Sequence, residues 1–464
     1  MYDNKKFIEN VNYINLHNKI KRKEARILIF GLGYVGLPLA MGLSEEGYEV
    51  TGVDVNNEKV SKLLNGESYI IDISSSKIKK NIDNHNFIPT TDTTVIKNAD
   101  VIIICVPTPL KKNQEPDMSY IESVVDLLKQ YIKKGTLIIL ESTTYPGTTE
   151  ELIQKEIDQL GYVVGEDYFL CFSPERVDPG NTNFRIENTP KVIGGTTPLC
   201  LDLACHIYNT FINKIVTVST PKVAEMSKLL ENTFRSINIA FINEMALMCD
   251  RMGVDIWEVI KAASSKPFGF MTFYPGPGIG GHCIPLDPMY LSWKAKGYNF
   301  YSKFIEIAQE INKNMPYYVV NKITEALNVA GKPLKSSKVL ILGMAYKPDV
   351  DDVRESPSLE VFELLHRKGA IVDFNDPYVN YFEIFQNKKY SVKLLSENIK
   401  TYDCTVLLTA HKIYDYKLIL ENSSLIVDTR NVFEEFSKSN PKIFKIGNSN
   451  QEFNFNNLKN AINQ

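Results

Sequence analysis

The sequence predicts an α/β protein in which two Rossmann-like, doubly wound domains are joined by a central long-helix domain. Three observations support this fold class. Short apolar strand candidates alternate with helical segments from residue 26 onward, which is typical of a parallel sheet covered by helices. One long amphipathic helix interrupts this pattern after residue 220. The strand–helix alternation then starts again at residue 338.

Length and composition agree with this architecture. At 464 residues, the chain is long enough for roughly three domains. We expect an N-terminal extension at 1–25, a first Rossmann-like domain at 26–216, a central helical domain at 217–330 and a second Rossmann-like domain at 331–464. The extension is expected to be either a surface helix or a flexible segment. The hydrophobic share of 44% suits a soluble globular protein, and the net charge of −3 argues against nucleic acid or a membrane as a partner.

The cysteines and the N-terminal segment favour a cytoplasmic protein without a metal. Seven cysteines occur without a CxxC pair, which indicates reduced thiols. The polar first 25 residues lack the apolar run of a signal peptide, and no apolar run approaches the roughly 20 residues that span a membrane. Cys200, Cys205 and His206 lie close in sequence, but no second ligand cluster completes a metal site, so we expect core cysteines on a helix.

The elements follow from hydrophobic periodicity. The first domain is expected to hold a parallel sheet with strands at 26–30, 49–53, 101–106 and 137–140, extended by 168–171 and 191–194. From about Pro221 to Met252, apolar side chains recur at steps of three and four residues, which predicts one long helix that joins domains and forms a dimer interface. A second helix is expected at 302–330. The last domain should have strands at 338–342, 370–374, 403–408 and 425–427 and a helix at 358–368.

A dinucleotide fingerprint, Gly31-Leu-Gly33-Tyr34-Val35-Gly36, lies between the first strand and the first helix. The first glycine permits a tight turn, the second lets the backbone approach a pyrophosphate, and the third lets helix and strand pack closely. Asp54 follows 23 positions after Gly31 and is expected to bind the adenosine ribose, which predicts NAD rather than NADP. The alternative is that Asp54 is only a solvated strand end.

Two further loops follow strands of the same sheet. Thr108 comes after the strand at 101–106, and Ser142 and Thr143 come after the strand at 137–140. Loops at the carboxyl ends of parallel strands face the ligand crevice, so we expect these residues near the cofactor. Plain turn chemistry is the alternative, because serine and threonine favour turns.

A cysteine follows two glycines in Gly280-Gly281-His282-Cys283-Ile-Pro-Leu-Asp287. A thiolate in such an irregular segment can add to an aldehyde and hold it as a thiohemiacetal, which a second oxidation converts to a thioester. Cys283 needs a nearby cation, helix N-terminus or base to be reactive, since an ordinary thiol has a pKa near 8.5. Taken alone, it is equally explained as a small core residue.

This motif resembles the active-site segment of the UDP-glucose/GDP-mannose dehydrogenase family. Other segments resemble the same family in order, namely Ser173-Pro-Glu175-Arg176, Glu225-Met-Ser-Lys228-Leu-Leu-Glu-Asn232-Thr-Phe-Arg235, Tyr346-Lys347-Pro-Asp-Val-Asp-Asp-Val-Arg354 and Asp428-Thr429-Arg430. The resemblance implies an NAD-binding domain, a central dimerisation domain with the catalytic cysteine, and a UDP-sugar-binding domain. It also implies oxidation of a sugar C6 alcohol to a carboxylate with reduction of two NAD.

The resemblance also implies the roles of individual residues. Cys283 matches the nucleophile, Lys228 and Asn232 match oxyanion-stabilising groups, Asp287 and Glu175 match acid/base and water-handling carboxylates, and Thr143 matches a residue near the reacting carbon. The expected substrate-binding residues are Glu175, Arg176, Lys228, Asn232, Arg235, Tyr274, Gly280, Lys347, Arg354 and Arg430. Lys228 and Asn232 are four residues apart and therefore share one helix face, which suits joint action on one oxygen.

The stretch from Ser265 to Gly278 is similar to the UDP-N-acetylglucosamine 6-dehydrogenases of bacterial polysaccharide pathways, which favours that sugar. UDP-N-acetylmannosamine, UDP-N-acetylgalactosamine and UDP-glucose remain alternatives. The aromatic residues in this stretch, among them Tyr274, fit either contact with the sugar or core packing. A two-electron dehydrogenase that needs no Cys283 is a competing enzyme class, and a non-catalytic nucleotide-sugar-binding protein is a remote alternative. We expect a homodimer or a dimer-based oligomer.

Overall fold

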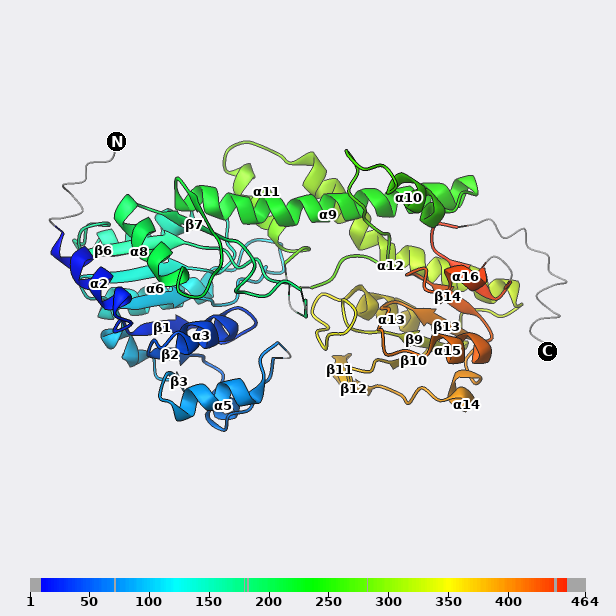
Figure 1. Cartoon of the computed structure of the whole chain (residues 1–464). Coiled ribbons are helices and arrows are strands. Elements are labelled where there is room, and N and C mark those ends of the chain that lie inside the picture. The colour runs from blue at the N-terminus through cyan, green and yellow to red at the C-terminus, as the bar shows by residue number, and fades with distance from the viewer. Residues whose placement is uncertain are drawn as a thin grey trace. The chain divides into compact units, whose positions relative to one another are not determined.

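The computed structural model describes residues 10–70, 72–178, 180–181, 183–281, 283–437 and 440–448 (Figure 1). The chain separates into two compact units. The first comprises 1–231 with 289–300, and the second comprises 232–288 with 301–464. The long helix α9 (Pro221–Met252) begins in the first unit and ends in the second. Its bounds are those that the hydrophobic periodicity predicted.

The first unit is built on an eight-stranded sheet in the order β3-β2-β1-β4-β5-β6-β7-β8. The strands are β1 (Ile27–Phe30), β2 (Val50–Val53), β3 (Phe87–Thr90), β4 (Val101–Ile104), β5 (Thr136–Leu140), β6 (Tyr168–Phe172), β7 (Lys191–Gly195) and β8 (Ile215–Val218). Their helices are α3 (Gly36–Glu45), α4 (Asn57–Leu64), α5 (Ser75–Asp83), α6 (Ser119–Tyr131), α7 (Lys155–Asp158) and α8 (Pro198–Tyr208), with a short 3₁₀-helix η1 (Thr93–Asn98) and a π-helix η2 (Thr149–Gln154). Helix α11 (Asp287–Lys296) also lies in this unit except for its first two residues, which belong to the second unit. Central strands such as β4 and β5 are buried along their whole length, which explains their unbroken apolar runs.

One prediction about this sheet was wrong. The strands at 168–171 and 191–194 were expected to extend a wholly parallel sheet, but β7 runs antiparallel to β6. The next strand, β8, is parallel to β7, so the last two strands both run opposite to the first six. Hydrophobic patterns show that a strand is buried but not which way it runs, and the long connection between β6 and β7 allows either direction.

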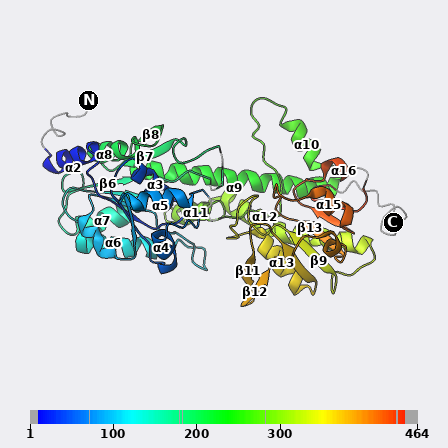
Figure 2. The ribbon, with the colours of Figure 1, turned by 60° about the horizontal axis from the view of Figure 1, so that its bottom comes forward.

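The N-terminal extension forms a helix, which is one of the two alternatives that the sequence left open. Helix α2 (Val11–Lys21) begins at Asn10, whose side chain accepts a hydrogen bond from the Tyr13 N–H. It buries Tyr13, Leu16 and Ile20 in the core of the first unit and lies beside α8 (Figure 2). The helix therefore belongs to this unit.

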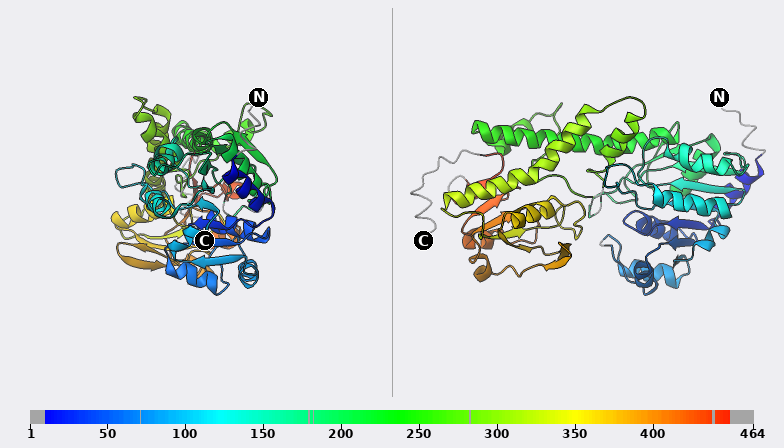
Figure 3. Two further views of the ribbon diagram at one scale, coloured as in Figure 1. Left: turned by 90° about the vertical axis from the view of Figure 1, so that its left-hand side faces the viewer. Right: turned by 180° about the vertical axis from the view of Figure 1, so that it is seen from behind.

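The second unit contains a five-stranded parallel sheet in the order β10-β9-β13-β14-β15 and a separate hairpin of β11 and β12. Its strands are β9 (Lys338–Leu342), β10 (Ile371–Asn375), β11 (Tyr381–Ile384), β12 (Asn387–Tyr390), β13 (Cys404–Leu407), β14 (Ile426–Asp428) and β15 (Ile443–Lys445). Its helices are α10 (Ile256–Ala263), α12 (Lys303–Val329), α13 (Pro357–Arg367), α14 (Ser396–Ile399), α15 (Tyr416–Asn422) and α16 (Glu434–Ser437). Helix α12 lies across β13 and β14 (Figure 3).

The two sheets confirm the predicted fold class, with the second Rossmann-like arrangement beginning at β9. Among the described residues, no helix combines the length and the apolar character that a membrane span requires. The core of the second unit gathers apolar residues from α9, α10, α12 and the sheet, so the end of the long helix is packed into it.

Candidate functional site

The glycine fingerprint forms a tight turn between β1 and α3. Gly31 has a φ of +89°, and a Cβ atom there would lie 2.5 Å from the Cys105 carbonyl oxygen. A Cβ on Gly36 would lie 1.9 Å from the Gly31 oxygen, so both positions require glycine for internal packing. At Gly33, no described atom lies within 4 Å of a Cβ position. The open space beside Gly33, at the start of a helix, fits a bound pyrophosphate.

Asp54 follows β2 and supports this turn. Its Oδ2 accepts a hydrogen bond from the Leu32 N–H at 3.0 Å, and its Oδ1 accepts one from the Asn56 N–H at 2.9 Å. The ammonium group of Lys59 lies 3.4 Å from Oδ2. The carboxylate is buried at the carboxyl end of β2 beside the fingerprint. This placement agrees with a ribose-binding role and excludes a merely solvated strand end.

The two loops after β4 and β5 lie at the same edge of the sheet. Thr108 is buried, and the Tyr290 hydroxyl donates to its carbonyl oxygen at 2.8 Å. The Ser142 hydroxyl donates to the Val106 carbonyl oxygen at 2.8 Å, so it closes the turn, as the alternative interpretation held. The neighbouring Thr143 is half-buried. Tyr34 and Val35 are also half-buried, at the start of α3.

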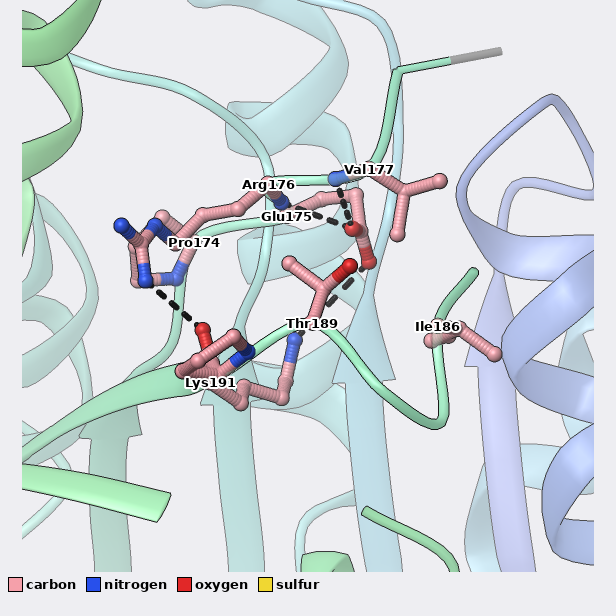
Figure 4. A pocket seen from close by; sticks show the side chains of 8 residues that line it. Pro174, Glu175, Arg176, Val177, Ile186, Thr189 and Lys191 are labelled. Atoms are coloured by element: carbon pink, nitrogen blue, oxygen red, sulfur yellow. Dashed lines mark hydrogen bonds and ion pairs between the residues drawn. The ribbon is translucent and has the colours of Figure 1, made fainter. Parts of the chain in front are cut away.

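Glu175 lies in the loop after β6, and both of its oxygens are constrained (Figure 4). Oε1 accepts hydrogen bonds from the N–H groups of Arg176 at 2.7 Å and Val177 at 2.6 Å. Oε2 is buried without a hydrogen-bond donor among the described residues, and Nζ of Lys191 lies 3.9 Å away. Burying an acceptor oxygen without a hydrogen bond costs folding free energy, because the oxygen loses its bonds to water. Glu175 is thus arranged to accept a hydrogen bond or a proton from a bound molecule.

Lys191 joins Glu175 to a second buried carboxylate that the sequence analysis missed. Its Nζ lies 2.8 Å from Oε2 of Glu141, which follows β5, and the Tyr208 hydroxyl donates to Oε1 of Glu141. Burial raises the pKa of Glu141. Burial also opposes the charged form of Lys191, but the two carboxylates outweigh it and raise the lysine pKa. Two features of the sequence indicate such a pair: Lys191 stands at the start of one apolar strand, and Glu141 directly follows another.

Helix α9 contributes to the first unit through its opening turns. The buried Glu225 accepts hydrogen bonds from the N–H groups of Gly147 at 2.5 Å and Thr149 at 2.9 Å, which fixes the loop after β5. Arg176 forms a bidentate pair with Glu231 of α9, with N···O distances of 3.1 Å and 2.7 Å. Its remaining terminal nitrogen donates to a backbone carbonyl. The Arg176 guanidinium is therefore committed to protein groups rather than open to a substrate.

Lys228 is buried on α9 within the first unit. Asn232 lies one turn further along α9 and belongs to the second unit. Arg235, which follows on the same helix, is exposed.

In the second unit, Cys283, Asp287 and Asn232 are brought together. All seven cysteines are described, and among them only Cys283 is exposed. The Cys283 carbonyl oxygen accepts the Asp287 N–H at 2.9 Å, which starts α11. The buried Asp287 carboxylate accepts a hydrogen bond from the Asn232 side chain at 2.5 Å. The predicted nucleophile thus lies one turn from a carboxylate–amide pair, while His282 is outside the described residues.

Glycines bring the cysteine loop against the loop after β9. A Cβ on Gly280 would lie 2.7 Å from Tyr346 Cβ, and one on Gly281 would lie 2.8 Å from the same tyrosine ring. The Gly281 N–H donates to the Arg354 carbonyl oxygen at 3.0 Å. Gly280 is therefore a packing position that fixes the cysteine loop, and substitution there would displace Tyr346.

Arg430 lies against the start of the same glycine-rich segment. A Cβ on Gly276 would meet the Arg430 guanidinium at 2.4 Å, and the Gly276 N–H donates to Asn243 of α9 at 3.0 Å. The Arg430 Nε donates to the Leu408 carbonyl oxygen at 2.7 Å. Burial lowers the pKa of Arg430 to about 10, opposed by Asp428, so the guanidinium stays charged at neutral pH. It is a fixed cation within the second unit.

The other predicted substrate residues of the second unit differ in exposure. Arg354 is exposed and forms a bidentate pair with Asp352 at 3.0 Å and 2.7 Å. Lys347 is half-buried next to Tyr346. The ring of Tyr274 stacks on Trp257, with centroids 6.2 Å apart, yet its side chain is 62% exposed. Tyr274 is therefore not a core residue.

Comparison with protein families agrees with this geometry. Three consecutive stretches match the UDP-glucose/GDP-mannose dehydrogenase family: its NAD binding domain at 25–212, its central domain at 222–314 and its UDP binding domain at 340–435. The chain belongs to this family. It is an NAD-dependent nucleotide-sugar dehydrogenase, which confirms the predicted enzyme class and cofactor.

Individual family members resemble the whole chain. A UDP-N-acetyl-D-mannosamine dehydrogenase of Methanococcus maripaludis is 36% identical over 424 residues, covering 88% of this chain and 93% of the relative. The UDP-D-ManNAc dehydrogenase structure from Pyrococcus horikoshii matches with a TM-score of 0.83 and 32% identity, covering 92% of this chain and all of that one. An NDP-N-acetyl-D-galactosaminuronic acid dehydrogenase from Methanosarcina mazei matches with a TM-score of 0.76 and 29% identity, covering 94% of this chain and 99% of that one.

Proposed function

We propose that this dehydrogenase oxidises the C6 alcohol of a UDP-N-acetylhexosamine to the uronate in a four-electron reaction through a Cys283 thioester. The exposed residue Cys283, one helical turn before the Asp287 of the buried Asn232–Asp287 pair, carries the proposal. Binding alone would not need a nucleophile, and a two-electron oxidation would not need to hold the aldehyde. The other cysteines are buried or half-buried, and burial raises the pKa of Cys105, Cys171, Cys200 and Cys404, which keeps those thiols protonated.

The cofactor contacts proposed for this chain follow from the first unit. The open space at Gly33 and the start of α3 would receive the pyrophosphate, and Asp54 would receive the ribose. Bound NAD supplies a hydride acceptor. Thr108, Ser142 and Thr143, in loops at the same sheet edge, would line the cofactor crevice.

The proposed residue roles follow the order of the chemistry. The C6 alcohol would lose a proton to a base and a hydride to bound NAD, which gives the aldehyde. The Cys283 sulfur adds to the aldehyde carbon to form a thiohemiacetal, and loss of a second hydride to a second NAD would leave the thioester. Lys228 and Asn232 stabilise the negative oxygen at this carbon, and each such donor contributes on the order of 2.7–4 kcal/mol in a transition state. Glu175 or Asp287 then directs water onto the thioester, which releases the uronate and the thiol. Thr143 is proposed to lie near C6.

Further substrate-binding groups are proposed in the second unit. Arg354, Arg430 and Lys347 would contact the nucleotide sugar, with Arg430 as a cation already fixed within the fold. Arg235 and Tyr274 are exposed and remain proposed contacts. Gly280 would act by holding the cysteine loop in place.

The relatives change the preferred sugar. The sequence stretch up to Gly278 favoured UDP-N-acetylglucosamine, whereas the named relatives at 34–36% identity are UDP-N-acetyl-D-mannosamine dehydrogenases. We therefore propose UDP-N-acetyl-D-mannosamine as the first substrate to test. The two sugars differ only in configuration at C2, remote from the C6 carbon that Cys283 attacks. The galactosamine epimer and UDP-glucose stay as alternatives.

The setting of the enzyme is also part of the proposal. Apolar side chains are exposed along α9, which supports a homodimer through this helix; they include Leu230, Phe234, Phe241, Met248 and Met252. A UDP-sugar uronate made in the cytoplasm would be a precursor of a surface polysaccharide such as a capsule or O-antigen. We also propose the domain limits that the strand and helix patterns of the sequence predict, at 26–216, 217–330 and 331–464.

The deciding experiment is the yield of NADH per limiting molecule of each UDP-N-acetylhexosamine, with mass spectrometry of the product. Two NADH and a uronate from the mannosamine substrate would support both the thioester route and the sugar. One NADH per sugar would point to a two-electron enzyme. No NADH from any UDP-sugar would favour the non-catalytic alternative.

A further inference from the structure

Side chains of the types that can bind metals gather where the N-terminal extension packs on the first unit. His17 of α2 and Asp202 and His206 of α8 each offer one ligand atom, and these atoms all lie within 4.8 Å of one another. The sequence around His206 shows no second ligand cluster that would complete a metal site. The structure supplies one, because α2 brings His17 beside α8.

The spacing of the two imidazoles fits a shared ion. Nε2 of His17 lies 3.2 Å from Nε2 of His206. Two nitrogens bound at about 2.0–2.1 Å to one tetrahedral zinc ion lie roughly 3.3 Å apart. The side chains are half-buried or exposed, so an ion can reach them from solvent.

The surroundings of His206 set its tautomer. Its Nδ1 lies 3.0 Å from the Asp202 carbonyl oxygen, which only accepts hydrogen bonds, so Nδ1 carries the proton in the neutral ring. Nε2 then presents a lone pair toward His17. A histidine that ligates a metal through one nitrogen almost always donates from the other to a carbonyl or carboxylate, as His206 does here.

The carboxylate of Asp202 is oriented as well. The Tyr13 hydroxyl donates to Oδ2 of Asp202 at 2.7 Å, and this oxygen lies 3.5 Å from Nδ1 of His206. Tyr13 is therefore a supporting residue that fixes the third ligand. Without an ion, the two rings make one imidazole–imidazole hydrogen bond, which is the competing explanation for the 3.2 Å distance.

We propose that His17, Asp202 and His206 bind one divalent transition-metal ion, zinc in the first instance, which fastens α2 to α8. Two imidazoles and a carboxylate are ligands that zinc accepts in a tetrahedral site, with water in the fourth position. An 11-residue helix is marginal by itself, and α2 buries only Tyr13, Leu16 and Ile20. Metal binding to the folded chain alone would stabilise this attachment by mass action. The site has no part in the oxidation.

The test measures zinc binding by the full chain, by isothermal titration calorimetry and by metal analysis after dialysis. All variants carry Cys283→Ala, because an exposed thiol is itself a zinc ligand. We expect one zinc per chain, with the dissociation constant raised at least tenfold by His17→Ala and by His206→Ala. Tyr13→Phe should raise it about tenfold through the supporting contact. His366→Ala, an exposed helix histidine of the second unit, is the matched control and should leave binding unchanged.

Thermal unfolding distinguishes a bound zinc ion from a hydrogen bond between the imidazoles of His17 and His206. Zinc should raise the thermal midpoint of the Cys283→Ala chain, a chelator should reverse this, and His17→Ala should abolish the response. Circular dichroism confirms that each variant is folded. If His206→Ala does not fold, His17→Ala alone decides the matter. Stoichiometric zinc binding that survives both histidine substitutions, or no zinc binding at all, would overturn the proposal and leave the hydrogen bond as the explanation.

Discussion

Replacing Lys191 by methionine tests whether one ammonium group holds the buried charges at the carboxyl edge of the first sheet. The lysine side chain is 4% exposed, its partner Glu141 is fully buried, and their charged atoms are 2.8 Å apart. Removing one partner of a buried ion pair costs about 3–5 kcal/mol, because the remaining charge is left without a counter-ion. In a unit of 150–250 residues, this corresponds to a thermal midpoint lower by about 6–20 °C.

A compensating change tests the cause of this loss. Replacing Glu141 by glutamine in the same chain removes the second charge and keeps an oxygen that the Tyr208 hydroxyl can bond. We expect the double variant Lys191→Met/Glu141→Gln to recover most of the lost stability, since replacing both charges by neutral groups of similar size is often nearly neutral. A simple packing defect would not be recovered in this way.

The loss should also depend on pH with a defined sign. Burial raises the pKa of Glu141 above its ordinary value of 4.5, and Lys191 opposes this rise. Without the lysine, Glu141 of the folded chain keeps its proton at pH values where Glu141 of the unfolded chain has already lost it. The free energy of unfolding therefore falls as the pH rises from the ordinary pKa of this carboxyl to its raised pKa in the folded chain. The deficit of Lys191→Met should therefore be larger at pH 8 than at pH 5.

The two tryptophans allow the first unit to be followed by itself. Trp257 belongs to the second unit and Trp293 to the first, so a Trp257→Phe background leaves Trp293 as the reporter of unfolding. Lys155→Met, at an exposed lysine of the same unit, is the matched control. The reasoning is refuted if Lys191→Met unfolds at the midpoint of its parent, or if the double variant loses as much as the two single variants combined.

Three further predictions address the remaining parts of the enzyme. Cys283→Ala should abolish uronate and NADH formation while UDP-sugar affinity, measured by calorimetry, changes less than about threefold; near-normal turnover would exclude the thioester route. Gly33→Ala should raise the NAD dissociation constant at least tenfold with an unchanged thermal midpoint, whereas Gly36→Ala should lower the midpoint because its Cβ meets the backbone at 1.9 Å. Burial by itself raises the pKa of the Asp376 carboxyl, but hydrogen bonds from His411 and from backbone N–H groups outweigh it and hold that pKa below 3.8. The ionised carboxylate therefore stabilises the fold above its ordinary pKa of 3.8, and this stabilisation is lost as the pH falls through the lowered pKa. Asp376→Asn should lower the free energy of unfolding by about 1.5–3 kcal/mol at pH 7 and make the urea midpoint less dependent on pH in acid.

The sequence was sufficient where local pattern determines structure. The three- and four-residue spacing of apolar side chains predicted α9 and its approximate bounds, and the fingerprint between β1 and α3 lies where a strand–turn–helix unit was expected. For α2 the sequence left a surface helix and a flexible segment as alternatives. Its polar sequence gives no clear amphipathic pattern, and its three buried side chains pack against distant segments. Arg176 was expected to bind the substrate, yet its guanidinium pairs with Glu231. The two residues are far apart in sequence, so no local pattern predicts this pair.

The direction of β7 accounts for the buried charges that the sequence did not reveal. In the antiparallel pairing, Cys171 faces Gly195 and Phe172 faces Gly194, so each step forward along β6 is a step back along β7. Continuing this register beyond the paired residues puts Lys191 opposite Glu175. Had β7 been parallel, as predicted, its first residue would lie at the amino-terminal edge of the sheet, away from Glu175 and Glu141. The reversed strand therefore places a lysine among the carboxylates at the edge where parallel sheets bind their ligands.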